Sequence, residues 1–366
     1  MAQLVAMATI SGALGAPGTW GPYGRAAVIA VNFDDTSVQY AVSVDKQGWL
    51  VSSALPRLFC DGAWRTLALL APPRANTSVD PRLGPTATLT KQWGVAKAAG
   101  GACGGPGALM TTTIAYYAAD DTLEFTTSFP RGVGSTGGCP QPSCAGCKLD
   151  DLFGNATKVP LSEFPSFKQG PGTALHDTLG WWQWGGGFSQ YRTGGGVGLK
   201  RRESGQKRVA GEGKGLVGGQ EGGPLVLFEA GKARGAALVL SPMSAWFSAM
   251  LGISGGGSTS NSTSADALGS LVAGVQGGVS SIPKGHSVSF AIVATVAGVS
   301  NSTSSGVNAA VECWGGVLRK KYGTDKSRYA TDIVTNKLGY WTDNGGYFYG
   351  TKYPCSGVNC VSHLCC

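Results

Sequence analysis

Apolar and polar residues alternate along much of the chain between residues 27 and 295, and this spacing predicts β-strands. Val38, Tyr40, Val42 and Val44 alternate with more polar neighbours, which is the period of a half-buried strand. Residues 288–294 repeat the same pattern. The alternation therefore favours sheets that bury one face and expose the other.

Turn residues divide this region into hairpins. One is predicted from residues 111–118, a turn at 119–121 and a return strand at 123–129. Another combines 225–228 with 236–240 across a turn near Gly231. Many short strands joined by turns are typical of a β-sandwich. We therefore expect a mainly β fold, with a sandwich domain over residues 1–298.

Two stretches interrupt the strand pattern. Residues 193–222 are glycine-rich and basic, and residues 254–265 are rich in glycine, serine and threonine. Such compositions are typical of surface insertions. We expect both to be insertions within the sandwich.

The spacing changes to a helical period after residue 298. Val307, Ala310, Val311, Trp314 and Leu318 would share one helix face. Basic residues at 319–321 suit the carboxyl end of a helix, and the glycine at 323 would cap it. We predict a helix over 306–322, with a second helical turn near 329–336. Residues 299–336 would then form linker helices.

Composition excludes several classes of protein. Charged residues make up 14% of the chain and hydrophobic residues 42%, which is too apolar for a wholly disordered protein. No apolar run reaches the roughly 20 residues of a membrane helix, so we expect no membrane insertion. The net charge is +8, but residues 200–214 hold much of it without interleaved aromatics. We therefore expect no nucleic-acid partner.

Ten cysteines and several glycosylation sequons point to an oxidising compartment. Cys139, Cys144 and Cys147 lack a second Cys or His pair, so they favour a disulfide over a metal site, and we expect no metal. Sequons begin at four asparagines, and we expect these to be glycosylated: Asn76, Asn155, Asn261 and Asn301. We predict a protein of the secretory pathway or the extracellular space.

A short apolar run at 338–341 ends in polar residues and glycines. If it is a strand, Trp341 offers a ring on which a sugar can stack, and Asp343 and Asn344 offer hydrogen bonds to its hydroxyls. The same residues also suit a simple turn. The first interpretation predicts a carbohydrate partner.

The run Lys337–Tyr349 resembles the start of the barrel in a family of eukaryotic glycoside-hydrolase-like proteins, which is distantly similar to α-galactosidases and raffinose synthases. Four further segments resemble strands of the sandwich that precedes that barrel: 179–181, 223–228, 238–242 and 279–283. Residues 306–322 resemble the helix that links the sandwich to the barrel. The resemblance implies a large supersandwich-like β-sandwich, a linker helix and a β/α barrel, acting on α-linked carbohydrate without a cofactor.

The chain departs from that family after the first barrel strand. A complete barrel needs about 250 residues, and only residues 350–366 follow the resembling run. We therefore expect residues 337–366 to be a truncated barrel start with a cysteine-rich tail. The catalytic residues would lie downstream, and the chain would be catalytically incomplete.

Two other functions stay open. The chain could be a non-catalytic carbohydrate-binding sandwich, with Trp181, Trp182 and Trp184 as sugar contacts or as core. It could also be a non-functional fragment from an incorrect gene prediction.

The match of residues 252–256 to a nucleophile elbow is explained by chance, because that motif needs a helix after it and a stretch of glycine, serine and threonine follows instead. Oligomeric state is not predicted.

Overall fold

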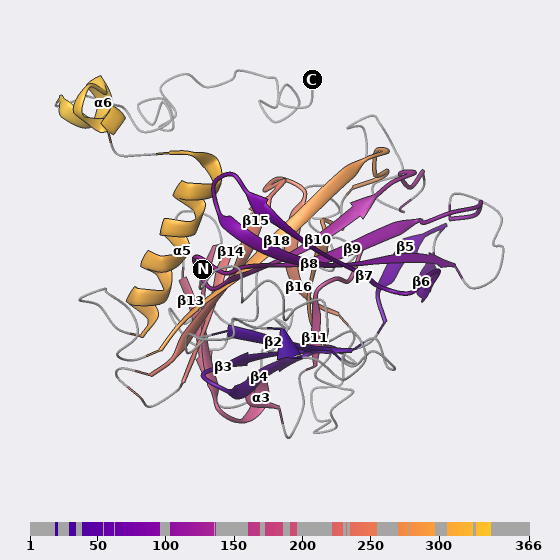
Figure 1. Ribbon diagram of the computed structural model, residues 1–366, viewed down its shortest axis with the longest axis horizontal. Coiled ribbons are helices and arrows are strands. Elements are labelled where there is room, and N and C mark those ends of the chain that lie inside the picture. Colours follow the sequence, from indigo (N-terminus) through magenta and orange to yellow (C-terminus); the bar gives the residue numbers. More distant parts are fainter. Residues whose placement is uncertain are drawn as a thin grey trace, which may run out of the picture.

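The structure is a computed structural model that describes the greater part of the chain (Figure 1). The described residues are 19–20, 29–33, 39–53, 55–61, 63–95, 103–134, 136, 160–168, 173–185, 191–195, 222–229, 232, 235–254, 270–277, 279–296, 306–324 and 327–337.

An 11-stranded antiparallel sheet forms the centre of the molecule, in the order β13-β12-β14-β15-β18-β10-β9-β8-β6-β5, with β7 also paired to β8. From one edge to the other its strands are β13 (Tyr191–Gly195), β12 (Leu179–Gly185), β14 (Gly222–Glu229), β15 (Ala237–Ser244), β18 (His286–Thr295), β10 (Thr122–Phe129), β9 (Met110–Tyr117), β8 (Gly84–Val95), β7 (Arg74–Asp80), β6 (Ala63–Leu69) and β5 (Arg57–Cys60).

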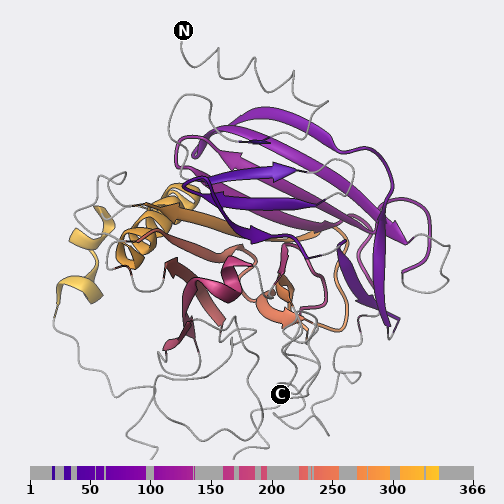
Figure 2. The same ribbon diagram turned by 90° about the horizontal axis from the view of Figure 1, so that it is seen from below.

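Two smaller antiparallel sheets pack on one face of the large sheet, called the inner face here (Figure 2). The first contains β1 (Thr19–Trp20), β2 (Ile29–Phe33), β3 (Tyr40–Val44) and β4 (Gln47–Val51). The second contains β11 (Ser166–Lys168), β17 (Ser270–Val275) and β16 (Ala249–Ser254). Buried side chains from all three sheets share one core, in a layered, sandwich-like arrangement.

Alternation along each central strand assigns its residues to the two faces. Leu123, Phe125 and Phe129 of β10 point into the inner core, while Glu124 and Thr126 lie on the outer face. Phe125 packs edge-on against Phe167 of the second small sheet, with ring centroids 6.2 Å apart. Aromatic packing of this kind joins the large sheet to its cover.

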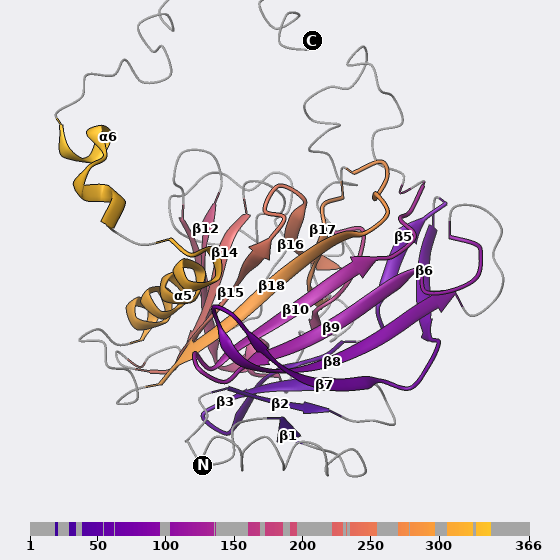
Figure 3. The same ribbon diagram turned by 45° about the horizontal axis from the view of Figure 1, so that its top comes forward.

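Helix α5 (Val307–Tyr322) covers part of the outer face, against β14, β15 and β18 (Figure 3). Ala310 and Val317 are its buried contacts with the apolar outer residues of those strands. The helix ends at Gly323, which is left-handed (φ 62°, ψ 35°) and donates its backbone N–H to the Arg319 and Lys320 carbonyls. Glycine adopts this conformation without steric cost.

The sequence predicted these elements well. The β9–β10 and β14–β15 hairpins are confirmed, and so are α5 and its glycine cap. The second helical turn is present as η3 (Ser327–Ala330) and α6 (Ile333–Asn336), and a further short helix, α3 (Ala174–Asp177), was not expected. The described residues contain no β/α barrel, because the expected barrel start at 338–366 lies outside them. None of the described helices is long and apolar enough to span a membrane.

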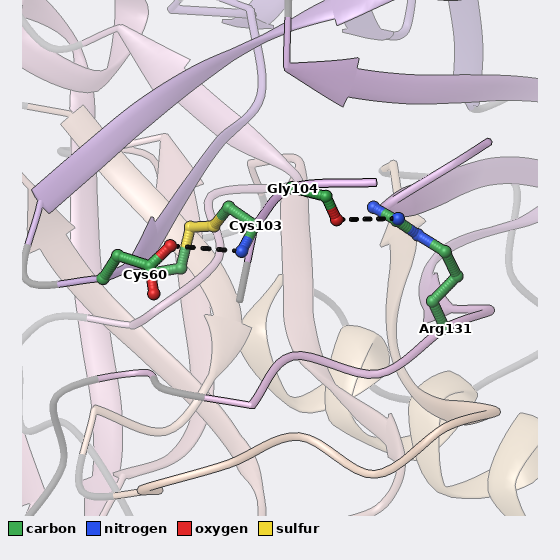
Figure 4. The surroundings of a disulfide bond; sticks show 5 residues. Cys60, Cys103, Gly104 and Arg131 are labelled. Atoms are coloured by element: carbon green, nitrogen blue, oxygen red, sulfur yellow. Dashed lines mark hydrogen bonds between the residues drawn. A yellow bond between two sulfur atoms is a disulfide. The ribbon is translucent and has the colours of Figure 1, made fainter. Parts of the chain in front are cut away.

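A disulfide joins Cys60, at the end of β5, to Cys103 before β9 (Figure 4). The Cys103 N–H donates to Asp61 Oδ2 at 3.2 Å, and Arg131 Nη1 donates to the neighbouring Gly104 carbonyl at 2.9 Å. These bonds hold the loop that contains Cys103 and Gly104 against the edge of the large sheet. This pair was not predicted from the sequence, and the cysteines that were predicted to form a disulfide (Cys139, Cys144 and Cys147) lie outside the described residues.

Replacing Cys60 and Cys103 together by serine is expected to lower the free energy of unfolding by about 2–4 kcal/mol, because the bond closes a loop across a separation of 43 residues. Urea unfolding without reductant measures the loss. Cys313→Ser is the control, since Cys313 is a free thiol, and it should cost less than about 1 kcal/mol. A double variant as stable as the wild-type chain would contradict the bond.

Candidate functional site

Most of the residues predicted to bind sugar or to be glycosylated lie outside the described chain. Trp341, Asp343 and Asn344 lie outside it, as do the sequons at 155, 261 and 301. Asn76 is on β7 with its side chain exposed. Among the four sequon asparagines, Asn76 is thus the one that the structure places at the surface of the described residues.

The two tryptophans of β12 whose side chains the structure describes do not form an exposed platform. Trp181 faces the inner core and is 5% exposed. Trp182 is on the opposite face, half-buried against the cluster that α5 covers. For Trp184 only the strand backbone is described. The core interpretation is thus confirmed for Trp181, and Trp182 helps to seat the helix.

A buried polar cluster lies where the carboxyl end of α5 meets the sheet. We call it the α5 anchor: Glu124 of β10, Tyr117 of β9, Ser289 of β18 and Lys321 of α5. Lys321 Nζ donates to both Glu124 oxygens, at 2.9 and 2.8 Å. Ser289 Oγ donates to Glu124 Oε1 at 2.7 Å, and Tyr117 OH donates to Oε2 at 2.6 Å.

These bonds determine what the Glu124 carboxylate can do. Each of its oxygens accepts two hydrogen bonds, and the residue is only 5% exposed, so no face is open to a substrate. Burial, and then the neighbouring carboxylate, raise the pKa of Tyr117 well above its usual range, so the phenol stays a proton donor. The α5 anchor is therefore a structural lock.

Further contacts hold the same helix end. Lys320 Nζ pairs with Asp120 Oδ1 in the β9–β10 turn, and Arg82 Nη1 donates to the Lys321 carbonyl at 2.7 Å. Cations at a helix carboxyl end also offset the helix dipole. The end of α5 is consequently fixed in both position and direction.

Beside the α5 anchor, three aromatic side chains are exposed. We call them the aromatic corner: Trp246 and Phe247 in the turn between β15 and β16, and Tyr322 at the end of α5. Their exposed fractions are 40%, 82% and 46%. Trp246 Nε1 donates to Tyr322 OH at 3.2 Å, and Tyr322 OH donates to the Met243 carbonyl. Exposed rings of this kind can stack on a flat, partly apolar ligand.

A cavity between the layers is too small for a sugar. Its volume is about 10 Å³, enough for about one water molecule. It is lined partly by Tyr40, Lys91, Trp93 and Thr112, and Trp93 Nε1 donates to Thr112 Oγ1 at 2.8 Å. Burial raises the pKa of Tyr40 well above its usual range. This cavity belongs to the core and is not a binding site for carbohydrate.

One group of metal-ligand residue types occurs within the described part of the chain: Cys60, Asp61 and Cys103. The two sulfur atoms are bonded to each other, so neither is a thiolate that could bind a metal. The group therefore does not make a metal site.

No family model matches the chain, and no curated protein matches it in sequence. Among solved structures it is similar to α-N-acetylgalactosaminidase NagBb from Bifidobacterium bifidum in a GalNAc complex, with TM-score 0.44 and 11% identity over 84% of this chain and 39% of that chain. The galactosidase domain of α-galactosidase-sucrose kinase AgaSK gives TM-score 0.35 and 6% identity over 70% of this chain and 31% of that chain.

A third similar structure, HI1317, gives TM-score 0.36 and 9% identity over 74% of this chain and 90% of that chain. The chain spans about two fifths of the length of NagBb. At these TM-scores the similarity assigns neither a family nor a function. A functional proposal has to rest on the residues themselves.

Neither the α5 anchor nor the aromatic corner is indicated by the sequence. Glu124 occupies an ordinary outer position in an alternating strand, and only the sheet order places it beneath Lys321. Trp246 and Phe247 follow a buried strand, so their apolar side chains do not show in the sequence that the strand has ended. Adjacent aromatics also occur inside strands of this chain, at Tyr116–Tyr117 and Trp181–Trp182, so the pair carries no local signal for a turn.

Lys321→Met is expected to lower the free energy of unfolding by about 2–4 kcal/mol, because it leaves the Glu124 carboxylate buried without its cation. Lys232→Met is the matched control. Lys232 pairs with Glu229 at 2.7 Å but is 63% exposed, so its loss should cost less than about 1 kcal/mol.

Chemical denaturation of both variants measures the difference. The double variant Glu124→Gln, Lys321→Met should recover part of the loss, because it removes the unpaired charge. Equal costs for the two lysine variants would contradict the structural role of the α5 anchor.

Proposed function

We propose that this chain is the N-terminal β-sandwich of a glycoside-hydrolase-like protein that acts on α-linked carbohydrate, and that it is catalytically incomplete by itself. The observation that carries the proposal is the order of elements. Layered antiparallel sheets are followed by α5 packed on the large sheet, and α6 then leads directly into the run Lys337–Tyr349. That run resembles the first barrel strand of the family named above.

In this proposal Trp341, Asp343 and Asn344 contact the substrate. Trp341 supplies a stacking face, and the carboxylate and amide bind hydroxyls at the carboxyl end of the strand, where barrel enzymes place their sites. Hydrolysis usually needs two carboxylates on either side of the glycosidic bond. Glu124 cannot be one of them, because both of its oxygens are engaged in the α5 anchor. The catalytic pair is expected downstream of residue 366.

The test is the complete transcript that contains these residues, expressed and assayed on p-nitrophenyl α-galactoside. We expect it to continue through a barrel of about 250 residues and to release p-nitrophenol, while residues 1–366 alone release none. Asp343→Asn in the longer protein should raise KM roughly tenfold, because a hydrogen bond to a charged group is lost.

Asp45→Asn is the control for that substitution. Asp45 is exposed in a turn with φ 48°, where asparagine is well tolerated, so KM should not change. A transcript that stops after Cys366 would sink the proposal, and so would hydrolysis by residues 1–366.

The proposed location is the secretory pathway. The Cys60–Cys103 disulfide supports it, since such bonds persist in oxidising compartments, and so does the exposed sequon at Asn76. Endoglycosidase treatment of the protein from its own cells should lower its mass, and Asn76→Gln should remove part of that shift. A mass that the enzyme does not change would argue against this location.

A second candidate function is non-catalytic carbohydrate binding by the sandwich. The aromatic corner favours it, because its rings are exposed in the described chain and need no barrel to be complete.

A further inference from the structure

Strand β7 forms an edge of the large sheet. It pairs with β8 on one side, and within the described chain no strand pairs with its other side. Five of its seven residues are exposed, and its one large apolar side chain, Val79, is 66% exposed. An edge strand with free backbone groups is a template on which another strand can pair.

The hydrogen bonds of β8 show which backbone groups of β7 point to the free edge. The Pro85 carbonyl accepts a bond from the Ala118 N–H at 3.1 Å, on the side of β9. Successive residues of a strand direct their backbone groups to opposite sides, so Thr86 directs its own to β7, where it lies opposite Ser78. The even-numbered residues of β7 therefore bond to β8, and residues 75, 77 and 79 point their N–H and C=O groups outward.

The sequence of β7 is complementary to itself when two copies run antiparallel. With Thr77 of one copy opposite Thr77 of the other, Arg74 of each copy lies opposite Asp80 of the partner subunit. Asn76 then lies opposite Ser78, which pairs two polar side chains. The three outward-facing residues also meet one another in this register, so about six backbone hydrogen bonds close, two at each position.

Two prolines bound the complementary segment symmetrically. Pro73 and Pro81 have no N–H and cannot extend a ladder of backbone bonds. In the register centred on Thr77 they lie opposite each other, just outside the paired residues. A shift of one residue would set outward-facing groups against inward-facing ones, and a shift of two would bring a proline into the ladder. The sequence therefore favours one register.

Charge favours a second copy over an unrelated strand. Arg74 is exposed, and no described carboxylate forms an ion pair with it. The Leu83 N–H donates to Asp80 Oδ1 at 2.8 Å and holds the pKa of that carboxyl below its usual range, so Asp80 stays charged. The net charge of +8 opposes association, but charges more than about 10 Å apart are screened in 0.1 M salt, whereas the Arg74–Asp80 pairs would be in contact.

We propose that β7 is the interface of a two-fold symmetric dimer, in which β7 of a second copy of this chain joins the large sheet antiparallel and centred on Thr77. The same surface is used on both subunits, as in most dimers. Asn76 points away from the ladder, so a glycan on it would project from the face of the joined sheet. One strand makes a small interface, so we expect a dissociation constant of roughly 10–100 μM. The inference goes beyond the proposed function and does not depend on it.

Sedimentation of residues 1–366 at physiological salt tests the proposal, with the chain made in bacteria so that Asn76 carries no glycan. Thr77→Pro removes an outward N–H and should weaken dimerisation at least tenfold. An edge strand tolerates this proline, because that N–H takes no part in the pairing with β8. Thr77→Val is the matched control: it keeps the N–H and the branched shape, so it should dimerise as the wild type does.

Arg74→Asp tests the end pairs. It places like charges opposite each other at both ends of the interface and should also weaken dimerisation at least tenfold. Lys284→Asp is the matched control, because it makes the same change of charge before β18, which three strands separate from β7. It should leave dimerisation unchanged. Denaturant unfolding of each variant confirms that it is folded.

Thr77→Cys tests the register. Directly opposite residues of a hydrogen-bonded antiparallel pair have Cα atoms about 5.5 Å apart, which is within the range of a disulfide. Two copies of this variant should therefore cross-link under mild oxidation. Ser78→Cys should cross-link far more slowly, because Ser78 lies opposite Asn76 and not opposite itself.

Three results would overturn the proposal. The first is a chain that stays monomeric well above the expected dissociation constant. The second is a dimer that Thr77→Pro and Arg74→Asp leave intact, which would place the interface elsewhere, for example at the aromatic corner. The third is cross-linking through Ser78→Cys as fast as through Thr77→Cys, which would exclude the register. Since neither hydrolysis nor sugar binding is measured, each outcome is separate from the fate of the proposed function.

Discussion

The buried contact between helix α5 and the outer face of the large sheet is the constraint on which the rest of this structure depends. Outer positions on β14, β15 and β18 include Val226, Val239 and Val293, and these side chains would face water without the helix. Across β8, β9 and β10 most outer positions are polar, and threonine is the commonest residue there, so this part needs less apolar cover. The boundary between the apolar and polar halves of this face therefore determines where α5 can lie.

The α5 anchor sits on that boundary and converts a non-directional apolar contact into a fixed position. Apolar burial alone would allow the helix to slide, whereas the Lys321–Glu124 pair has defined geometry and is costly to break once buried. Because Tyr322 is the next residue, fixing Lys321 also fixes the ring that orients Trp246. The α5 anchor thus also fixes the position of the aromatic corner.

Local elements were predictable from the sequence, and their assembly was not. The β9–β10 hairpin and α5 follow from period and from turn or cap residues, which act over a few positions. The Cys60–Cys103 bond and the Glu124–Lys321 pair join residues 43 and 197 positions apart, and no local pattern selects such partners. Trp246 and Phe247 were not predicted for a different reason: they follow a strand that is buried on both faces, so their apolar character does not mark where that strand ends.

Native-state hydrogen exchange tests most directly whether α5 is an integral part of the sandwich, held by the α5 anchor. If it is, the amides of residues 311–321 exchange with the same opening free energy as those of β10 and β18, because helix and sheet open as one cooperative unit. Lys321→Met should then lower the opening free energy of the helix below that of the strands. Rapid exchange throughout α5 in the wild-type chain, with β10 and β18 still protected, would contradict the account.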